Sequence, residues 1–289
     1  MRLARSLGNT MAELTRNKSG LAGLIIVTAF LVMAVFAPFI SPADPDKGDI
    51  ADRLIPPAWS PEGSSTYILG TDSVGRDILS HIIYGSRVSM AVGIISVTIS
   101  AGVGGVLGAV AGYCGGWPDK TLSRFGELLM AFPFLIFAIG IMAVMGPGFA
   151  NLIGALTFKS WVEFFRLVRG ETLDQKGRDY VSAARALGLS GPRIMASEIT
   201  PNVFQSVLVL STLRLGDMIM VEASLSFLGI GVQPGIPAWG SMIASGRDLI
   251  TRAWWVSTMP GVALLLLVLG LNLLGEGLRD ITDPRLRTS

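Results

Sequence analysis

The chain has 289 residues, of which 51% are hydrophobic and only 15% are charged. An average soluble domain carries about 25% charged residues, so this composition excludes an ordinary water-soluble domain and favours a protein embedded in lipid. The formal net charge of +2 is too small to indicate a nucleic-acid-binding protein. The single cysteine, Cys114, excludes an intramolecular disulfide, and the single histidine, His81, has no partner at metal-binding spacing. We therefore expect no metal and no other cofactor in this chain.

Six apolar stretches are each long enough to cross a bilayer, which takes about 20 helical residues for roughly 30 Å of hydrocarbon. They predict an all-α, polytopic membrane protein with six transmembrane helices. The first stretch follows several basic residues, as in a signal peptide, but it is too long and has no A-x-A site after it, so we expect a retained anchor. The predicted spans are 21–40, 88–112, 127–145, 149–168, 203–230 and 254–274.

The distribution of lysine and arginine predicts the orientation of these spans. The segment 166–200 alone carries six basic residues, and it falls on the same side as both termini. By the positive-inside rule that side is cytoplasmic. We predict a cytoplasmic segment 1–20, a first transmembrane helix 21–40, an extracytoplasmic loop 41–87, a five-helix core 88–279 with a cytoplasmic loop 169–202, and a cytoplasmic tail 280–289.

Small residues recur every four positions along the second predicted span. Lipid offers no hydrophobic drive between helices, so small residues on one helix face predict close backbone approach to a neighbouring helix. One stripe consists of Gly104, Gly108 and Gly112, and a neighbouring stripe consists of Ala101, Gly105 and Ala109.

The fifth predicted span contains three charged residues, Arg214, Asp217 and Glu222. A charge at the bilayer midplane costs at least about 2.5 to 3.5 kcal/mol, so such residues pair with one another or line a watery cavity. Arg214 and Asp217 are three residues apart and can meet on one helix face. Two interpretations remain open: a local ion pair without a substrate role, or a translocation path for polar cargo. Lys159 and Glu163, four residues apart, are predicted to pair with each other.

The cytoplasmic loop 169–202 has a helical pattern over 179–187, with Gly188 as its C-cap and Pro192 in the first turn of a following helix. This loop resembles the coupling loop of permeases in bacterial ATP-binding-cassette importers, whose pattern is E-A-A, a glycine and a closing proline. Ser182 stands at the glutamate position and Thr200 replaces the usual leucine before the proline. By this resemblance the residues that contact the ATPase are Arg169, Gly170, Tyr180, Ser182, Ala183, Ala184, Gly188 and Pro201.

Three further segments are similar to the dipeptide, oligopeptide and nickel branch of these permeases. They are Leu69–Ser89 (L-G-T-D-S-V-G-R-D), Val221–Pro234 with P-A-W-G at 237–240, and Gly277–Arg287. We call Leu69–Ser89 the signature segment. Asp72, Arg76 and Asp77 either meet a binding protein or seal an outer gate, or they form a plain loop network. Together with Gly75 they are the candidate residues of this segment.

The resemblance implies the fold of type I importer permeases (MetI-like) and a multi-pass protein of the bacterial inner membrane. It also implies three kinds of partner: a sister permease, two cytoplasmic ATP-binding subunits and an extracytoplasmic solute-binding protein. The cargo would be a dipeptide, an oligopeptide, glutathione or a nickel chelate. ATP binding would move the loop around 182–188 and transmit that movement into the fourth and fifth spans.

The chain itself is not expected to be an enzyme. It contains no glycine-rich loop ending in G-K-[ST], so ATP and Mg²⁺ would be bound by the partner subunits. Two alternatives stay open. An ion-gradient-driven secondary transporter would need a titratable relay at midplane, for which Asp217 and Glu222 are the candidates. A scaffold membrane protein would need neither the coupling loop nor a charged span.

Overall fold

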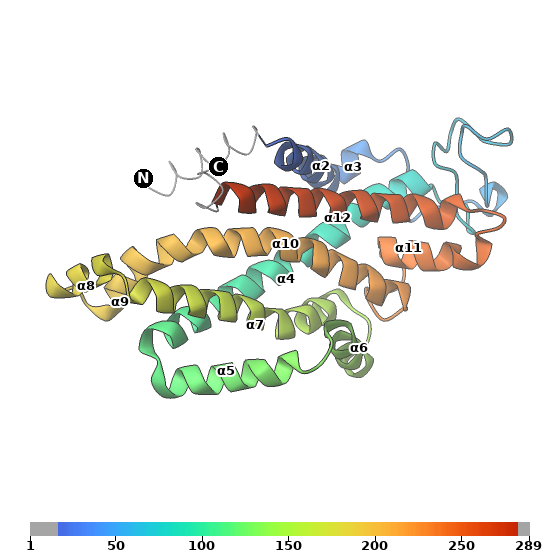
Figure 1. Ribbon diagram of the computed structural model, residues 1–289. Coiled ribbons are helices and arrows are strands. Elements are labelled where there is room, and N and C mark those ends of the chain that lie inside the picture. The colour runs from blue at the N-terminus through green and yellow to red at the C-terminus, as the bar shows by residue number, and fades with distance from the viewer. Residues whose placement is uncertain (1–16, 283–289) are drawn as a thin grey trace.

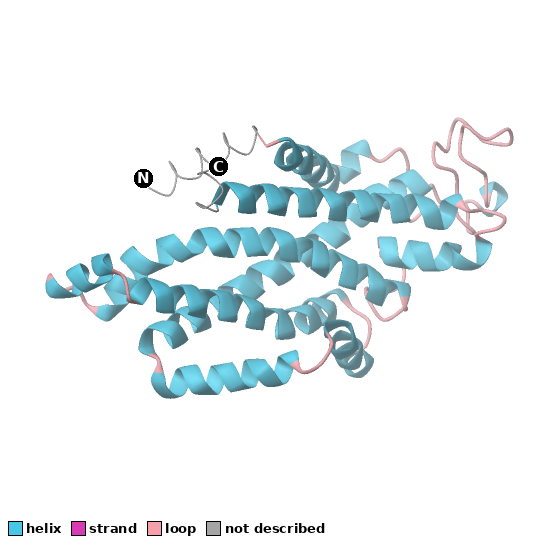
Figure 2. Ribbon diagram, viewed as in Figure 1, coloured by secondary structure: helices cyan, strands magenta, loops and turns pink. Residues whose placement is uncertain are grey.

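The computed structural model describes residues 17–282, and this part of the chain consists of helices joined by loops, without a strand (Figures 1 and 2). The all-α prediction is confirmed. The basic segment 1–16 and the residues 283–289, which include the end of the tail motif, lie outside the described residues. The helices are α2 (Lys18–Val35), α3 (Ala37–Ile40), α4 (Ile78–Cys114), α5 (Gly116–Met130), α6 (Phe134–Met145), α7 (Phe149–Lys176), α8 (Asp179–Ala186), α9 (Gly191–Ile194), α10 (Thr200–Phe227), α11 (Trp239–Gly246) and α12 (Trp255–Thr282). Single turns of 3₁₀ helix lie at Ile50–Asp52 and Arg247–Leu249, and a π-helical turn at Met195–Ile199 joins α9 to α10.

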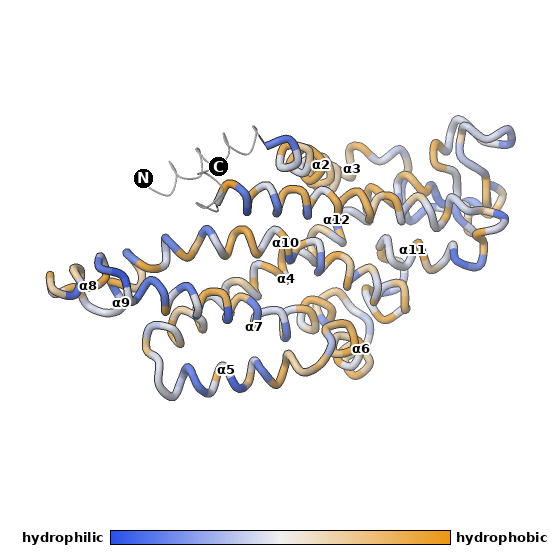
Figure 3. The backbone as a smooth tube through the Cα atoms, in the orientation of Figure 1, coloured by the Kyte–Doolittle hydropathy of each residue, from blue (hydrophilic) through white to orange (hydrophobic). Residues whose placement is uncertain are grey.

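Within residues 17–282, four helices are long and apolar enough to cross a membrane: α2, α4, the run Gly191–Phe227 that ends with α10, and α12. The bent pair α5 and α6 makes a fifth if it counts as one span. Helix α7 has 28 residues but carries Lys159, Glu163 and Arg166 along its length. The predicted six spans are compatible with this arrangement. Hydrophobic residues run along α2, α4 and α12, and hydrophilic ones gather near α8 and in the loops at the opposite end (Figure 3).

Helix α4 begins at Ile78, ten residues before the predicted second span. The Asp77 carboxylate caps it by accepting hydrogen bonds from the backbone N–H (2.8 Å) and the hydroxyl (2.5 Å) of Ser80. The 37 residues of α4 give a length of about 55 Å at 1.5 Å per residue, far more than the hydrocarbon needs. The last ten residues of the predicted loop 41–87 are therefore helical and extend the second span beyond the membrane.

The third predicted span, 127–145, is not one continuous helix. Helices α5 and α6 meet at an angle of 88°. Pro133 stands at the N-cap of α6, where its ring and missing N–H prevent the helix from continuing from Phe132. The ammonium group of Lys159 donates a hydrogen bond to the Phe132 carbonyl and lies 5.7 Å from the ring centroid of Phe134. A cation from α7 therefore satisfies the backbone at the break.

The glycine stripe of α4 packs closely on a neighbouring helix, as predicted, and the structure shows that this helix is α7. A Cβ atom added at Gly104 would lie 2.2 Å from the carbonyl oxygen of Trp161. One added at Gly108 would lie 2.6 Å from the carbonyl oxygen of Phe165. Only glycine permits these backbones to approach so closely.

Replacing Gly104 with alanine is expected to lower the thermal midpoint of the purified protein, because the new methyl group overlaps a backbone carbonyl and overpacking costs about 1 to 3 kcal/mol. The neighbouring change Gly105→Ala is the matched control, since a Cβ added at Gly105 would meet no heavy atom of another helix within 4 Å. Thermal unfolding in detergent compares the two variants. Equal midpoints would contradict the close α4–α7 contact.

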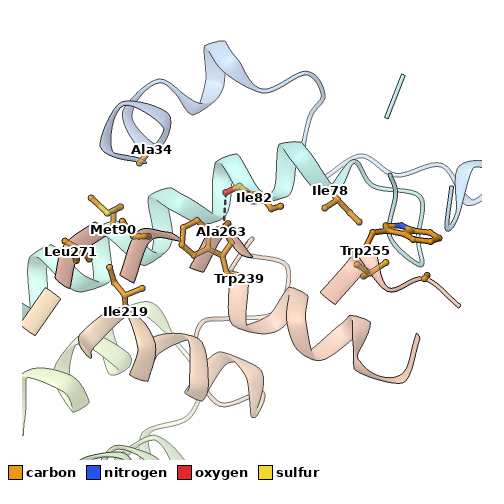
Figure 4. Packing of buried hydrophobic residues seen from close by; sticks show 12 residues of the cluster. Ala34, Ile78, Ile82, Met90, Ile219, Trp239, Trp255, Ala263 and Leu271 are labelled. Carbon is orange, nitrogen blue, oxygen red and sulfur yellow. Dashed lines mark hydrogen bonds between the residues drawn. The ribbon is translucent and has the colours of Figure 1, made fainter. Parts of the chain in front are cut away.

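A core of buried hydrophobic residues joins α2, α4, α10, α11 and α12 (Figure 4). Trp239 is fully buried there, and its indole N–H donates a 3.0 Å hydrogen bond to the Ile82 carbonyl, drawn as a dashed line in Figure 4. The Gly85 backbone leaves room for this ring, since a Cβ at Gly85 would lie 2.7 Å from it. The signature segment and the P-A-W-G segment, far apart in sequence, are therefore packed together.

Candidate functional site

Helix α8 has the cap that the sequence predicts. The N–H of Gly188 donates to the Arg185 carbonyl (2.9 Å), and the N–H of Leu189 donates to the Ala184 carbonyl (3.1 Å). This pair of bonds is the Schellman motif, and Gly188 has the positive φ of +79° that the motif requires. Pro192 lies in the first turn of α9, also as predicted.

Helix α8 has one buried face and one exposed face. Val181 and Ala184 pack into a small core with residues of α7, α9 and α10. Ser182 and Ala183 are exposed, and the side chain of Leu187, just after the helix, is 80% exposed. Together with α9, this helix forms one end of the bundle (Figure 1). The structure therefore presents a rigid, partly apolar surface at that end.

Three residues of the predicted cytoplasmic segment 169–202 belong to the long helices that flank α8 and α9. Arg169 and Gly170 belong to α7, which continues to Lys176, and Pro201 lies in the first turn of α10. Arg169 forms a two-bond ion pair with Asp119 of α5, with 2.9 Å between Nη2 and Oδ2. The predicted loop 169–202 is thus helical at both ends, and Arg169 contacts α5 rather than an exposed surface.

The Tyr180 side chain lies at the edge of the exposed face of α8. Its hydroxyl donates a 2.6 Å hydrogen bond to the Gln175 side chain and accepts one of 3.3 Å from the Asn202 side-chain amide. These bonds connect α8 to the end of α7 and the start of α10. Tyr180 therefore belongs with α8, as predicted.

The predicted contact between Arg214 and Asp217 is present, with 2.6 Å between Nη1 and Oδ2. Arg214 also approaches Glu163 of α7, with 2.5 Å between Nε and Oε2, in an ion pair that lacks hydrogen-bond alignment. The predicted pairing of Lys159 with Glu163 is wrong, because Lys159 is drawn to the α5–α6 break. One guanidinium therefore lies between two carboxylates, and these three side chains, which we call the charged face, are 34% to 53% exposed.

Glu222 does not join the charged face. Its side chain is fully buried between α4 and α10, where one carboxylate oxygen accepts a 3.0 Å hydrogen bond from Ser89 and the other a 2.8 Å bond from Ser226. No cation contacts this carboxyl group among the described residues. The structure thus separates Glu222 from Arg214 and Asp217, with which sequence reasoning had grouped it.

Replacing Glu222 with glutamine is expected to preserve assembly, because the amide can accept a hydrogen bond from one serine and donate one to the other. Replacing it with leucine leaves the buried hydroxyls of Ser89 and Ser226 without a partner, which costs about 1 to 3 kcal/mol. Thermal unfolding of the two purified variants measures the difference. A leucine variant as stable as the glutamine variant would argue against this hydrogen-bonded link.

The polar residues of the signature segment form a closed network. The Asp72 carboxylate accepts hydrogen bonds from the backbone N–H groups of Val74 and Arg76 (both 2.9 Å) and from the Arg76 guanidinium (2.8 Å). Gly75 has φ +80° and lies against the Asp49 backbone, where no side chain would fit. With Asp77 capping α4, the network satisfies these groups internally, which favours the plain structural interpretation.

Sequence reasoning missed three residues that take part in these contacts: Asp119, Glu163 as the partner of Arg214, and the role of Lys159 at the helix break. For Lys159 and Glu163 the available signal was charge inside an otherwise apolar segment, whereas Asp119 lies in a polar loop between two predicted spans and gave no such signal. The partners of all three lie on other segments of the chain. Within residues 17–282, no group of three or more His, Cys, Asp or Glu side chains is placed to hold a metal ion. The helices of spanning length define a multi-span membrane protein.

Comparison with known proteins specifies the class. Residues 104–288 match the family model described as binding-protein-dependent transport system inner membrane component, and residues 7–57 match the N-terminal transmembrane domain of oligopeptide transport permease C. The chain belongs to the family of binding-protein-dependent inner-membrane permeases. Its members are non-catalytic, multi-pass subunits of ATP-binding-cassette importers in the inner membrane.

Curated relatives match along nearly the whole chain. The dipeptide transport permease of Escherichia coli K12 is 42% identical over 94% of this chain and 91% of its own length. The di/tripeptide transport permease of Pseudomonas aeruginosa is 40% identical over 94% of this chain and 90% of its own. The glutathione transport permease of Pectobacterium atrosepticum is 40% identical over 94% of this chain and 89% of its own. A chain of the inward-facing MetNI methionine transporter has a TM-score of 0.57 at 18% identity and covers 70% of this chain and 97% of its own, which confirms the expected fold.

Proposed function

We propose that this chain pairs with a sister permease, and that two cytoplasmic ATP-binding subunits, which hold ATP and Mg²⁺, dock on the ends of the pair. The observation that carries the proposal is α8, a capped helix that presents Leu187 and the exposed Ser182 and Ala183 at one end of the bundle. A solute-binding protein would dock at the opposite end, near the signature segment. The family membership supports this division of labour.

In this proposal both chain termini lie on the cytoplasmic side, with α8. One contact and one feature of the arrangement support it. The Asn17 side chain at the start of α2 donates a 3.4 Å hydrogen bond to Asp280 near the end of α12. Helix α12 ends toward the same end of the bundle as α8 (Figure 1). The arginine and lysine residues of the segment 166–200 add the positive-inside argument.

The charged face is proposed to line the translocation path. Arg214, Asp217 and Glu163 lie within helices of spanning length, yet they are one-third to one-half exposed. Exposure of such groups to lipid is costly, so they face water or polar cargo between the two permeases. Charges of both signs suit a zwitterionic cargo, and short peptides, which several relatives are named for, are the cargo we propose.

ATP binding by the partner subunits would move α8, and α7 and α10, which flank it, would transmit this movement to the charged face. The paired permeases would then change from an inward-facing to an outward-facing state, and hydrolysis would reset them. Such a shift requires that the ATP-bound partners bind the two states with different affinity.

ATP hydrolysis by the reconstituted complex tests the proposal. Binding protein loaded with di- and tripeptides is expected to stimulate hydrolysis and to drive peptide uptake into proteoliposomes, while glutathione and a nickel chelate serve as comparison cargoes. Uptake driven by a proton gradient without ATP would contradict the proposal and favour a secondary transporter. Stimulation by glutathione alone would support the permease role but identify glutathione, rather than short peptides, as the cargo.

A further inference from the structure

The corner between α4 and α5 lies next to α8 and α9. Helix α4 ends at Cys114 and α5 begins at Gly116, so the chain reverses direction within two residues (Figure 1). Tyr113, half-buried, is the last aromatic residue before this corner. Its ring packs against the small core that holds Val181 and Ala184 of α8.

Three elements from outside α4 contact Tyr113. The Lys176 ammonium at the end of α7 donates a 2.6 Å hydrogen bond to the Tyr113 carbonyl and lies 5.4 Å from its ring centroid. The Arg185 guanidinium of α8 lies 5.9 Å from the same centroid. Cations at this distance from an aromatic ring are attracted to it. At the start of α9, a Cβ on Gly191 would lie only 3.1 Å from the ring, so the ring also rests against that backbone.

The first turn of α5 is held from a second direction. Asp119, three residues into α5, makes the two-bond ion pair with Arg169 of α7. Such a pair fixes orientation as well as distance. The corner is thus attached to α7 through Asp119 and Lys176. It is attached to α8 and α9 through the Tyr113 ring.

We infer that Tyr113 is a positioning residue that carries movement of α8 into α5, and through α5 into the broken span α5–α6. This inference rests on the proposed function, and it adds a route besides α7 and α10. A displacement of α8 must either move the corner with it or separate Arg185 and the Gly191 backbone from the ring. The hydrogen bond from Lys176 to the Tyr113 carbonyl also holds the corner to the end of α7.

The test uses the complete complex, with its ATP-binding subunits and binding protein, in a Cys114→Ser background. Spin labels on Asp179→Cys, an exposed position of α8 outside the proposed docking residues, and on Glu276→Cys report the α8–α12 distance. Labels on Lys120→Cys and Glu276→Cys report the α5–α12 distance. Both distances are measured with and without a non-hydrolysable ATP analogue in the parent and in Tyr113 variants.

The variants are Tyr113→Leu, which removes the aromatic ring, and Tyr113→Phe, which keeps it. Tyr113→Phe is therefore the matched control, because it retains the ring that Arg185 and the Gly191 backbone contact. In the parent, both distances should change with nucleotide. In Tyr113→Leu the α8–α12 change should persist and the α5–α12 change should become smaller than in the parent, because only the attachments of the corner to α7 remain. Cargo-stimulated hydrolysis should fall by about fivefold or more, the low end of typical allosteric coupling. Tyr113→Phe should behave as the parent does.

A nucleotide-dependent α5–α12 change of parental size in Tyr113→Leu would overturn the inference and leave the proposed function intact. Absence of any α8–α12 change in the parent would overturn both. Where Tyr113→Leu fails to assemble, Arg185→Gln replaces it, since this change removes the α8 cation from the Tyr113 ring at an exposed position and leaves the small core unaltered. A parental α5–α12 change in Arg185→Gln would then count against the inference.

Discussion

Replacing Leu187 with aspartate is expected to weaken association with the ATP-binding subunits by about tenfold or more and to remove cargo-stimulated hydrolysis. The Leu187 side chain is 80% exposed just after α8. The change removes an apolar side chain from the proposed interface, and the new carboxylate would have to give up its water there, which costs free energy. Co-purification and titration of the ATP-binding subunit against the permease pair measure the affinity.

Two control variants accompany this change. Leu187→Met keeps an apolar side chain of similar volume and should retain association. Leu228→Asp places the same charge on a leucine that is 54% exposed. This leucine follows the C-terminus of α10, whereas α8 precedes its N-terminus. Its association with the ATP-binding subunit should equal that of the parent. Undiminished association in Leu187→Asp would show that α8 is not the docking surface.

The change Arg214→Leu is expected to reduce peptide transport by about tenfold, equivalent to about 1.4 kcal/mol, because Glu163 and Asp217 lose the cation between them. The Arg214 side chain is about one-third exposed, so water screens its ion pairs and the loss of stability is smaller than for a fully buried pair. Uptake of labelled peptide into proteoliposomes measures transport, and thermal unfolding of the same preparations measures stability.

A neutral triple variant separates the two interpretations of the charged face. Arg214→Leu combined with Glu163→Gln and Asp217→Asn removes all three charges and therefore restores stability. If the three groups were only an ion-pair link between α7 and α10, transport would return as well. If they contact zwitterionic cargo, as proposed, transport stays low while stability recovers.

Features that depend on local sequence were predictable. The apolar stretches identify α2 and α12 because their exposed residues must be acceptable to lipid, and the glycine spacing on α4 identifies the face that meets α7. Gly188 indicates the end of α8 because few other residues adopt its positive φ without strain. Each of these signals lies within a few turns of one helix.

The features that were not predicted either depend on distant partners or have local signals that the hydropathy of the surrounding stretch outweighed. The stretch 127–145 is apolar as a whole, which concealed the break at Pro133, although proline itself was a local signal. The Asp77–Ser80 cap was likewise visible, but hydropathy placed the start of the span ten residues later. Spacing on α7 pointed from Glu163 to Lys159, and only the packing of α7 against α10 brings Arg214 within reach.

The break between α5 and α6 has a consequence for membrane insertion. Helix α6 has 12 residues and is therefore about 18 Å long, well short of the roughly 30 Å of hydrocarbon. A helix of this length cannot cross the bilayer alone, and α5 reaches it only at an angle of 88°. We expect this pair to leave the insertion machinery incompletely embedded and to settle only when α7, which is synthesised next, brings Lys159 to the Phe132 carbonyl. The order in which these three helices are synthesised is then part of how the subunit assembles.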